Sequence, residues 1–113
     1  MVVFDDLDFF IIKKIYNAFV DKKEITTWDL AKMYKWDIVP ENLGRFLTNK
    51  NNLIALRLKR MAGGGFVVVE KNGDGKNVYT LVKDKVIMCK HRFPNGYHDA
   101  ILVNCNGWCV FQT

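Results

Sequence analysis

The sequence predicts an α+β fold, with helices in the first half of the chain and strands in the second. Up to Met61, apolar residues recur every three or four positions, which is the spacing of one helix face. After the glycines at 63–65, the pattern changes to β-branched, alternating segments separated by turn residues. The chain has 113 residues, of which 50% are hydrophobic and 26% are charged, so the composition indicates one globular domain and excludes a disordered chain.

The first predicted helix begins at an aspartate, Asp5 or Asp6, because a carboxylate there accepts free backbone N–H groups and suits the helix dipole. It ends before Lys22 and Lys23, at a position that favours cations. The apolar residues that recur at helical spacing are expected to form its inward face, and they are Ile12, Ile15, Tyr16 and Phe19.

A second helix is predicted to begin after Thr26. Asp29 follows Thr26 by three residues, which is an imperfect capping box because glutamate is the more usual partner. Ile25 and Leu30 stand where a hydrophobic staple forms at a helix start. This helix is expected to end near residues 36–37, since a proline follows closely.

The stretch between this helix and the glycines admits two arrangements. In the first, a short helix opens at Pro40 or Glu41, residues 49–52 form a cap, and a separate helix spans 53–61. Asparagine supports this arrangement, because it is unfavourable inside helices and favourable at caps. In the second, one longer helix begins near Pro40. The glycines at 63–65 end the last helix in both cases.

Strands follow the glycines. Residues 66–71 and 77–82 are β-branched, and the turn sequence 72–76 between them predicts a hairpin. Further strands are expected over 85–93, 100–105 and 108–111, with turns at 94–96 and at Asn106-Gly107.

The three cysteines all lie in this last part of the chain. A two-residue loop at Asn106-Gly107 pairs Cys105 with Trp108, so Cys105 and Cys109 are expected on opposite faces and unable to form a disulfide. We therefore expect Cys89, Cys105 and Cys109 to be free, buried thiols.

Positive charge is concentrated in the middle of the chain. Residues 31–60 carry seven bases and two acids, whereas the whole chain has a net charge of +5. Such a patch is typical of proteins that bind a polyanion, although a solvated helix face has the same composition. The bases are Lys32, Lys35, Arg45, Lys50, Arg57, Lys59 and Arg60.

Three motifs occur in an informative order. They are Leu30-Ala31 in a capped helix, Leu58-Lys59-Arg60-Met61 at the end of a later helix, and Gly65-Phe66-Val67 opening a hairpin. Over residues 5–83 the chain resembles the winged helix-turn-helix family, in the style of small prokaryotic, archaeal or archaeal-virus transcription regulators. It departs from that family between Trp36 and Asn52, where the stretch is longer than the usual turn.

The resemblance implies a winged helix-turn-helix domain over residues 1–83, with residues 84–113 as a C-terminal β-hairpin extension. It also implies sequence-specific binding to double-stranded DNA and a role in transcription regulation. A recognition helix near 50–62 would enter the major groove, and a wing at 71–77 would meet phosphates or the minor groove.

Helical spacing then selects the residues at the DNA. If Ile54, Leu58 and Met61 face the core, the outward arc holds Asn52, Ala55, Leu56 and Lys59, flanked by Asn49 and Arg60. Asparagine bonds adenine in two places, and alanine allows close approach to a thymine methyl group. Arg45, Lys50 and Arg60 are expected on phosphates, with Lys71 and Lys76 at the wing, where Asp74 is unfavourable.

Two other functions remain open. The same fold serves in some proteins as a protein–protein interaction module without DNA binding, in which case the basic arc would meet an acidic protein surface. Alternatively, the aromatic residues of the tail would suit RNA. The asparagines at 49–52 are then only loop and cap residues.

No arrangement of residues points to an enzyme or a cofactor. Asp5, Asp6 and Asp8 are explained as acids at a helix start, and the glycines at 63–65 lack the Lys-Ser/Thr sequence of a phosphate loop. Cys89, His91 and His98 with a later cysteine would be the components of a zinc site, but their spacing matches no standard motif, so no metal is expected.

We expect a cytoplasmic protein, because no apolar run is long enough to span a membrane and the first residues are acidic, unlike a signal peptide. No small-molecule ligand is evident. The apolar tail at 84–113 cannot form a stable sheet in isolation, so it must pack on the preceding domain or on another copy. We expect a homodimer with this tail or the first helix in the contact, and the alternative is a tail that covers the domain of its own chain.

Overall fold

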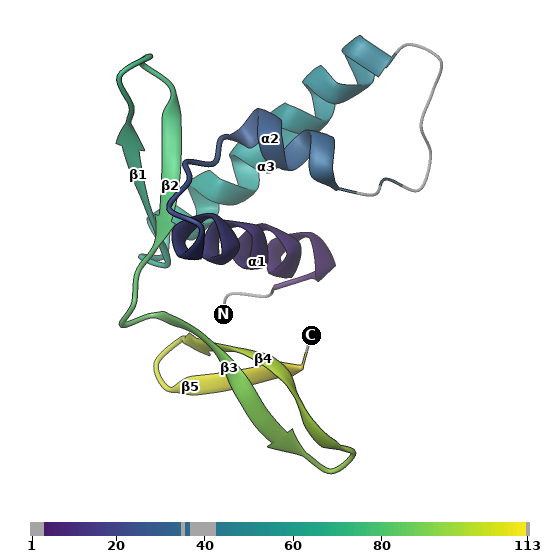
Figure 1. The fold of residues 1–113 in the computed structure, drawn as a ribbon, viewed down its shortest axis with the longest axis vertical. Helices are drawn as coiled ribbons and strands as arrows, with labels where there is room; N and C mark the ends of the chain where they lie inside the picture. Colours follow the sequence, from purple (N-terminus) through teal and green to yellow (C-terminus); the bar gives the residue numbers. More distant parts are fainter. Residues whose placement is uncertain (1–3, 35, 37–42, 113) are drawn as a thin grey trace.

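Three helices are followed by two small antiparallel sheets, so the architecture is α+β, as the sequence predicts (Figure 1). The structure is a computed structural model that describes residues 4–34, 36 and 43–112. Among the described helices, none has the length and apolar character needed to cross a bilayer. The helices are α1 (Asp6–Val20), α2 (Thr27–Met33) and α3 (Leu43–Gly63), and the strands are β1 (Val67–Lys71), β2 (Asn77–Leu81), β3 (Val86–Phe93), β4 (Gly96–Asn104) and β5 (Trp108–Gln112).

Reciprocal capping boxes start the first two helices, and both predicted starts are confirmed. At α1, the Asp5 carboxylate accepts a hydrogen bond from the Asp8 N–H at 3.0 Å, and the Asp8 carboxylate accepts one from the Asp5 N–H at 3.1 Å. At α2, Thr26 and Asp29 exchange the same two bonds at 3.3 and 3.0 Å. Each box satisfies two backbone donors that a helix start leaves free.

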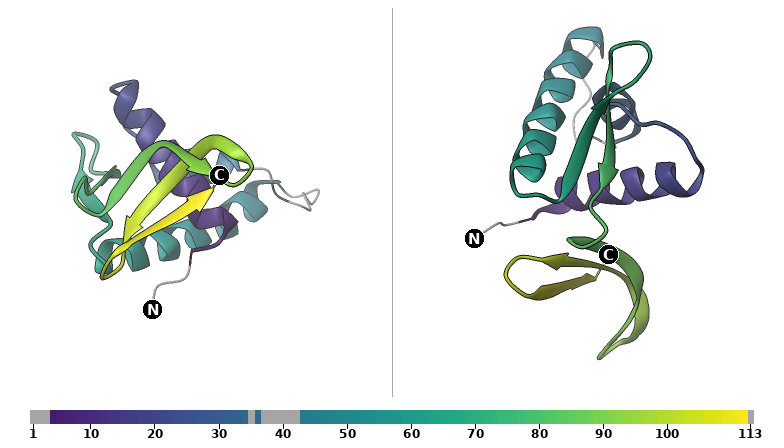
Figure 2. Two further views of the ribbon diagram at one scale, coloured as in Figure 1. Left: turned by 90° about the horizontal axis from the view of Figure 1, so that it is seen from below. Right: turned by 90° about the vertical axis from the view of Figure 1, so that its left-hand side faces the viewer.

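The buried stripe of α1 lies closer to its N-terminus than the sequence predicts. Ile12 and Ile15 are buried as expected, whereas Tyr16 is only half-buried and Phe19 is 56% exposed. The expectation for Phe19 is wrong because the C-terminal end of α1 projects beyond the hairpin and leaves the core (Figure 2). Leu7 and Ile11 extend the stripe at the other end instead.

Helix α2 ends at Met33, earlier than the predicted stop near 36–37. Tyr34 has extended dihedral angles, and the indole N–H of Trp36 donates to the Ala31 carbonyl at 3.0 Å, which satisfies an acceptor at the helix end. Aromatic packing therefore decides where α2 ends. A series of ring contacts connects α1 to α3 through Phe10, Tyr34, Trp36 and Phe46.

One continuous helix, α3, replaces the two short helices of the first predicted arrangement. The second arrangement agrees with the structure, in which α3 begins at Leu43, while its expected start near Pro40 lies outside the described residues. The predicted cap at 49–52 is wrong. Each asparagine costs about half a kcal/mol within a helix, and the packing of the inward face of α3 outweighs this cost. That inward face comprises Ile54, Leu58 and Met61, all buried.

The hairpin that follows α3 is confirmed. Helix α3 ends at Gly63, and Gly65 has φ of +82°, a conformation that glycine adopts without strain. Strands β1 and β2 pair in antiparallel register from Val67 opposite Leu81 to Lys71 opposite Asn77. The turn therefore occupies 72–76, as predicted.

The second sheet has the strand order β3-β4-β5, with both pairs antiparallel, and its first strand matches the predicted 85–93. The predicted two-residue loop between β4 and β5 is wrong. Residues 105–107 form the loop, and Asn104 lies opposite Trp108. Asn106 (φ 62°) and Gly107 (φ 134°) take the left-handed conformations, and the Asn104 carboxamide accepts a hydrogen bond from the Gly107 N–H at 3.0 Å.

Because of this three-residue loop, the cross-strand pairing of Cys105 and Cys109 differs from the predicted one. Cys109 lies opposite Val103 on the neighbouring strand, whereas Cys105 belongs to the loop. All three cysteines are free thiols, as expected. The expectation that they are buried is wrong, because Cys89 and Cys109 are exposed and Cys105 is half-buried.

One hydrophobic core joins the helices to both sheets. It contains Ile11 of α1, Ile54 of α3, Val67 of β1, and Ile101 with Val103 of β4. On the edge of the core, the Phe111 ring of β5 lies 5.0 Å from the ring of Phe9 and 6.3 Å from that of Phe4, measured between centroids. The β3-β4-β5 sheet lies on the side of α1 away from α2 and α3 (Figures 1 and 2).

A matched pair of substitutions tests whether this sheet belongs to the same cooperative unit. Ile101→Ala removes a fully buried side chain and should lower the free energy of unfolding by about 2–5 kcal/mol. Val110→Ala, at an exposed position of the same sheet, should cost less than about 1 kcal/mol. Urea unfolding followed by circular dichroism measures both values, and similar losses in the two variants would contradict the shared core.

Candidate nucleic-acid interface

Helix α3 presents one continuous exposed face, opposite its buried stripe. Asn49, Asn52 and Lys59 are exposed, and Leu56 between them is 65% exposed. Together with Arg45 these residues follow the spacing i, i+4, i+7, i+11, i+14, which places them in one row along the helix. We call the row Arg45, Asn49, Asn52, Leu56 and Lys59 the outer face of α3.

Four of the predicted site residues lie on this outer face, namely Arg45, Asn49, Asn52 and Lys59. Ala55 is half-buried at its margin, on the side that faces α2 and the hairpin. The end of α3 that carries Arg45 and the tip of the hairpin both point away from the C-terminal sheet (Figures 1 and 2). Two separate segments of the chain therefore project on the same side of the molecule.

Arg60 faces α1 instead. One guanidinium nitrogen of Arg60 lies 2.7 Å from the Asp8 carboxylate, whose side chain is fully buried. One guanidinium nitrogen of Arg57 lies 2.6 Å from a carboxylate oxygen of Asp5 and 3.4 Å from one of Asp8. Sequence reasoning assigned Arg60 to a phosphate, but the structure uses two arginines of the basic segment to neutralise acids at the start of α1.

These contacts change the titration of Asp5. The hydrogen bond from the Arg57 guanidinium lowers the pKa of Asp5 from 3.8 to about 2, and its bond from the Asp8 N–H acts in the same direction. In return, the Asp5 carboxylate raises the pKa of Arg57. A carboxylate stabilised in this way favours the folded state at neutral pH.

Lys50 packs against aromatic rings on the flank of α3. Its ammonium lies over the rings of Trp36 and Phe46, 4.8 and 5.3 Å from their centroids. Such cation–π contacts stabilise the packing of Trp36 against α3. The structure therefore separates Lys50, like Arg60, from the outer face that holds the other predicted residues.

Side-chain hydrogen bonds order the tip of the hairpin. The Asn72 carboxamide oxygen accepts from the N–H groups of Asp74 and Lys76 at 2.9 and 3.0 Å, and its amide donates to Glu24 at 3.0 Å. The Lys71 ammonium donates to the Gly75 carbonyl at 3.3 Å. Lys71 and Lys76 are both exposed, so the predicted wing residues lie together on a well-defined turn.

An open groove of about 710 Å³ lies between α2, α3 and the hairpin. Its charged residues are mixed in sign, since Glu24, Asp29 and Asp74 accompany Lys32 and Lys76. At its wall, burial raises the pKa of the Tyr79 hydroxyl, which stays protonated at neutral pH. This charge pattern does not single out an anionic ligand, so the groove separates the outer face of α3 from the hairpin rather than adding a basic surface.

Sequence reasoning did not place Trp28, Lys32 and Asn51 among the residues expected at the DNA, but all three border this groove. Helical spacing from the buried pair Leu30 and Ala31 turns Trp28 outward, so a wheel drawn for α2 contains the signal for it. The position of Asn51 follows only from the continuity of α3, which the sequence left open.

The alternative zinc site of the sequence analysis finds no counterpart. His91 lies opposite His98 on neighbouring strands, with Cys89 two residues away. Within residues 4–34, 36 and 43–112, however, no three histidine, cysteine or acidic side chains gather in a way that would hold a metal ion.

Comparison of the chain with protein-family models, curated proteins and solved structures finds no match.

The ion pair at α1 predicts a specific loss of stability in acid. Because the pKa of Asp5 is lower in the folded protein, its contribution is complete above pH 4 and is lost as the pH falls towards 2. Asp5→Asn keeps a good helix cap but removes the charge, so it should cost no more than about 1 kcal/mol at pH 7, since half of the Asp5 side chain is exposed.

Urea unfolding between pH 7 and pH 2 measures this effect. Asp5→Asn should lose less stability over that range than the unaltered protein, whereas Asp6→Asn, at an exposed neighbouring acid, should keep the full acid-dependent loss. Parallel pH profiles for Asp5→Asn and the unaltered protein would disprove the role of this pair.

Proposed function

We propose that residues 1–83 form a winged helix-turn-helix unit that binds double-stranded DNA in a sequence-specific manner and regulates transcription. In this proposal the N-terminal part of α3 enters the major groove, and the β1–β2 hairpin contacts the neighbouring phosphates. The observation that carries it is the outer face of α3, which is exposed along its length. The N-terminal end of this helix projects on the same side of the molecule as the tip of the hairpin, where Lys71 and Lys76 are exposed (Figure 2).

The dimensions of the outer face suit a major groove. An α-helix with its side chains fits that groove, and residues near its N-terminal end reach the base edges. Asn49 and Asn52 are one turn apart on this end of α3, and both carry the carboxamide that bonds adenine. Leu56 offers the apolar surface that a thymine methyl group requires.

The basic side chains near this face are expected to make different contacts. Arg45 and Lys59 lie at the two ends of the outer face, which suits contacts with phosphates on either side of the groove. Lys71 and Lys76 on the hairpin extend these contacts along the backbone. Arg60 leaves the proposed interface, because its guanidinium already pairs with the buried Asp8 carboxylate.

Leu56 also favours a second function, binding to another protein. A leucine that is 65% exposed in the middle of a helix face is an anchor that helix-mediated contacts commonly use. In that case Asn49 and Asn52 would surround an apolar contact, and affinity would depend only weakly on salt. The two functions therefore differ in a measurable quantity.

A gel-shift assay across a salt series tests the DNA proposal. The logarithm of the association constant should fall linearly with the logarithm of salt concentration, with a slope of about −0.9 for each phosphate contacted. Lys59→Ala should weaken binding to every duplex and reduce that slope by about one, whereas Lys90→Ala, on the distant sheet, should leave both unchanged. No binding at low salt would instead support the protein-interaction function.

The same assay with single-base variants of a selected DNA site distinguishes the residues that recognise bases from those that contact phosphates. Asn52→Ala should reduce discrimination at one base pair by about 1–3 kcal/mol and leave the salt slope unchanged. Equal weakening on all duplexes would remove Asn52 from the residues that read the sequence.

The proposal includes a homodimer, since two copies would read two half-sites about 10 base pairs apart. The outward side of the C-terminal sheet supports it. Ile87, Leu102 and Val110 lie opposite one another on the three strands, and Ile87 and Val110 are exposed. An apolar row across an exposed sheet is a surface that a second copy would cover.

Sedimentation velocity tests the dimer. Val110→Lys places a charge within the apolar row and should convert a dimer to a monomer, whereas Gln112→Lys, at the next exposed outward position of the same strand, should leave the dimer intact. A monomeric mass for the unaltered protein at micromolar concentration would refute this part of the proposal.

A further inference from the structure

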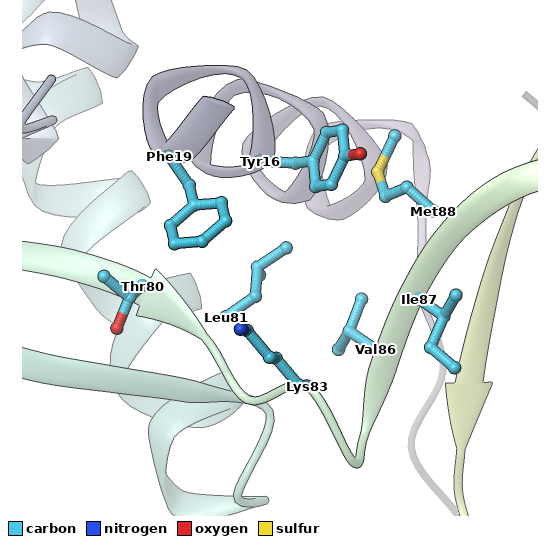
Figure 3. A pocket seen from close by; sticks show the side chains of 8 residues that line it. All are labelled: Tyr16, Phe19, Thr80, Leu81, Lys83, Val86, Ile87 and Met88. Carbon is cyan, nitrogen blue, oxygen red and sulfur yellow. The ribbon is translucent and has the colours of Figure 1, made fainter. Parts of the chain in front are cut away.

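A second cavity lies where α1, the end of β2 and the start of β3 meet (Figure 3). Its volume is about 430 Å³, which lies in the range of small-molecule sites. Tyr16 and Phe19 extend from α1 towards Leu81, Val86 and Met88 (Figure 3). The cavity is thus lined mainly by apolar side chains from three separate elements.

The connection between β2 and β3 holds the walls of this cavity in place. The N–H groups of Lys85 and Val86 both donate to the Val82 carbonyl at 3.0 Å, so the chain turns tightly between the two sheets. Val82 itself is tied to the hairpin, because its N–H donates to the Phe66 carbonyl at 2.9 Å. These hydrogen bonds fix the walls of the cavity, which reduces the ordering cost of binding.

Lys83 is the one charged residue in the lining. Its ammonium lies 5.5 Å from the centroid of the Phe19 ring, above its face. Among the described residues, no carboxylate lies within ion-pair distance of Lys83. Within the described part of the chain, the lining of this apolar cavity thus holds one positive charge, and that charge has no acidic partner.

We propose that this cavity binds a free monocarboxylate with an extended apolar body. The carboxylate meets the Lys83 ammonium, and the apolar body lies between Tyr16, Val86 and Met88. Burial of the chain supplies the affinity, since each buried methylene contributes about 0.8 kcal/mol, and the ion pair selects the anion. This inference concerns a different surface from the outer face of α3 and does not depend on DNA binding.

Titration calorimetry with four probes of related shape tests the site on the full chain. Octanoate carries both required features, octan-1-ol and octylammonium have the same chain without the negative charge, and acetate has the charge without the chain. Octanoate should bind about fivefold more tightly than octan-1-ol, as expected for a partly exposed ion pair, while acetate should show no heat of binding. Octylammonium should bind more weakly than octan-1-ol.

Two variants assign the binding to this cavity. Lys83→Met keeps the apolar stem and should remove the difference between octanoate and octan-1-ol, whereas Lys90→Met on the exposed part of β3 should preserve it. Met88→Trp fills the cavity and should abolish binding of both probes. Equal affinity for octanoate and octan-1-ol in the unaltered protein, absence of octanoate binding, or equal effects of Lys83→Met and Lys90→Met would overturn the proposal.

Discussion

The buried carboxylate of Asp8 is the constraint on which the arrangement of the helices depends. A charge with no solvent exposure is costly unless it is paired, and Asp8 is paired by the Asp5 N–H and by the guanidinium groups of Arg57 and Arg60. Because these arginines lie one turn apart on α3, they permit one rotation of that helix about its axis. This rotation directs Ile54 and Leu58 into the core and leaves the opposite side, the outer face of α3, towards solvent.

Several positive charges between residues 31 and 60 serve contacts within the protein, so the basic character of this segment is weaker evidence for a polyanion partner than the sequence suggests. Of the seven bases between 31 and 60, Arg57 and Arg60 neutralise acids of α1, and Lys50 packs over aromatic rings. A count of charges in sequence treats all of these residues as available to a polyanion. On the outer face of α3, two amides and a leucine lie between Arg45 and Lys59. Contacts with the edges of DNA bases would therefore matter more for affinity than in a uniformly basic helix.

Local signals in the sequence predicted those parts of the fold that local interactions decide. The capping pairs at 5–8 and 26–29 and the turn at 72–76 are short patterns whose partners lie within a few residues, and all appear in the structure. The continuity of α3 through the asparagines was left open, because it depends on packing against distant elements. The pairing of Arg60 with Asp8 joins residues 52 positions apart, and no periodicity in sequence reveals such a contact.

Helix α1 connects the two surfaces for which functions are proposed, but the connection differs at its two ends. Its N-terminal turn is tied to α3 by ion pairs, whereas its C-terminal half borders the apolar cavity through Tyr16 and Phe19. A ligand at one site changes affinity at the other only if it favours one of two arrangements of a shared element. The paired, buried Asp8 resists displacement of α1 relative to α3, so occupation of the cavity would stabilise the contact between α1 and the C-terminal sheet while leaving the outer face of α3 in place.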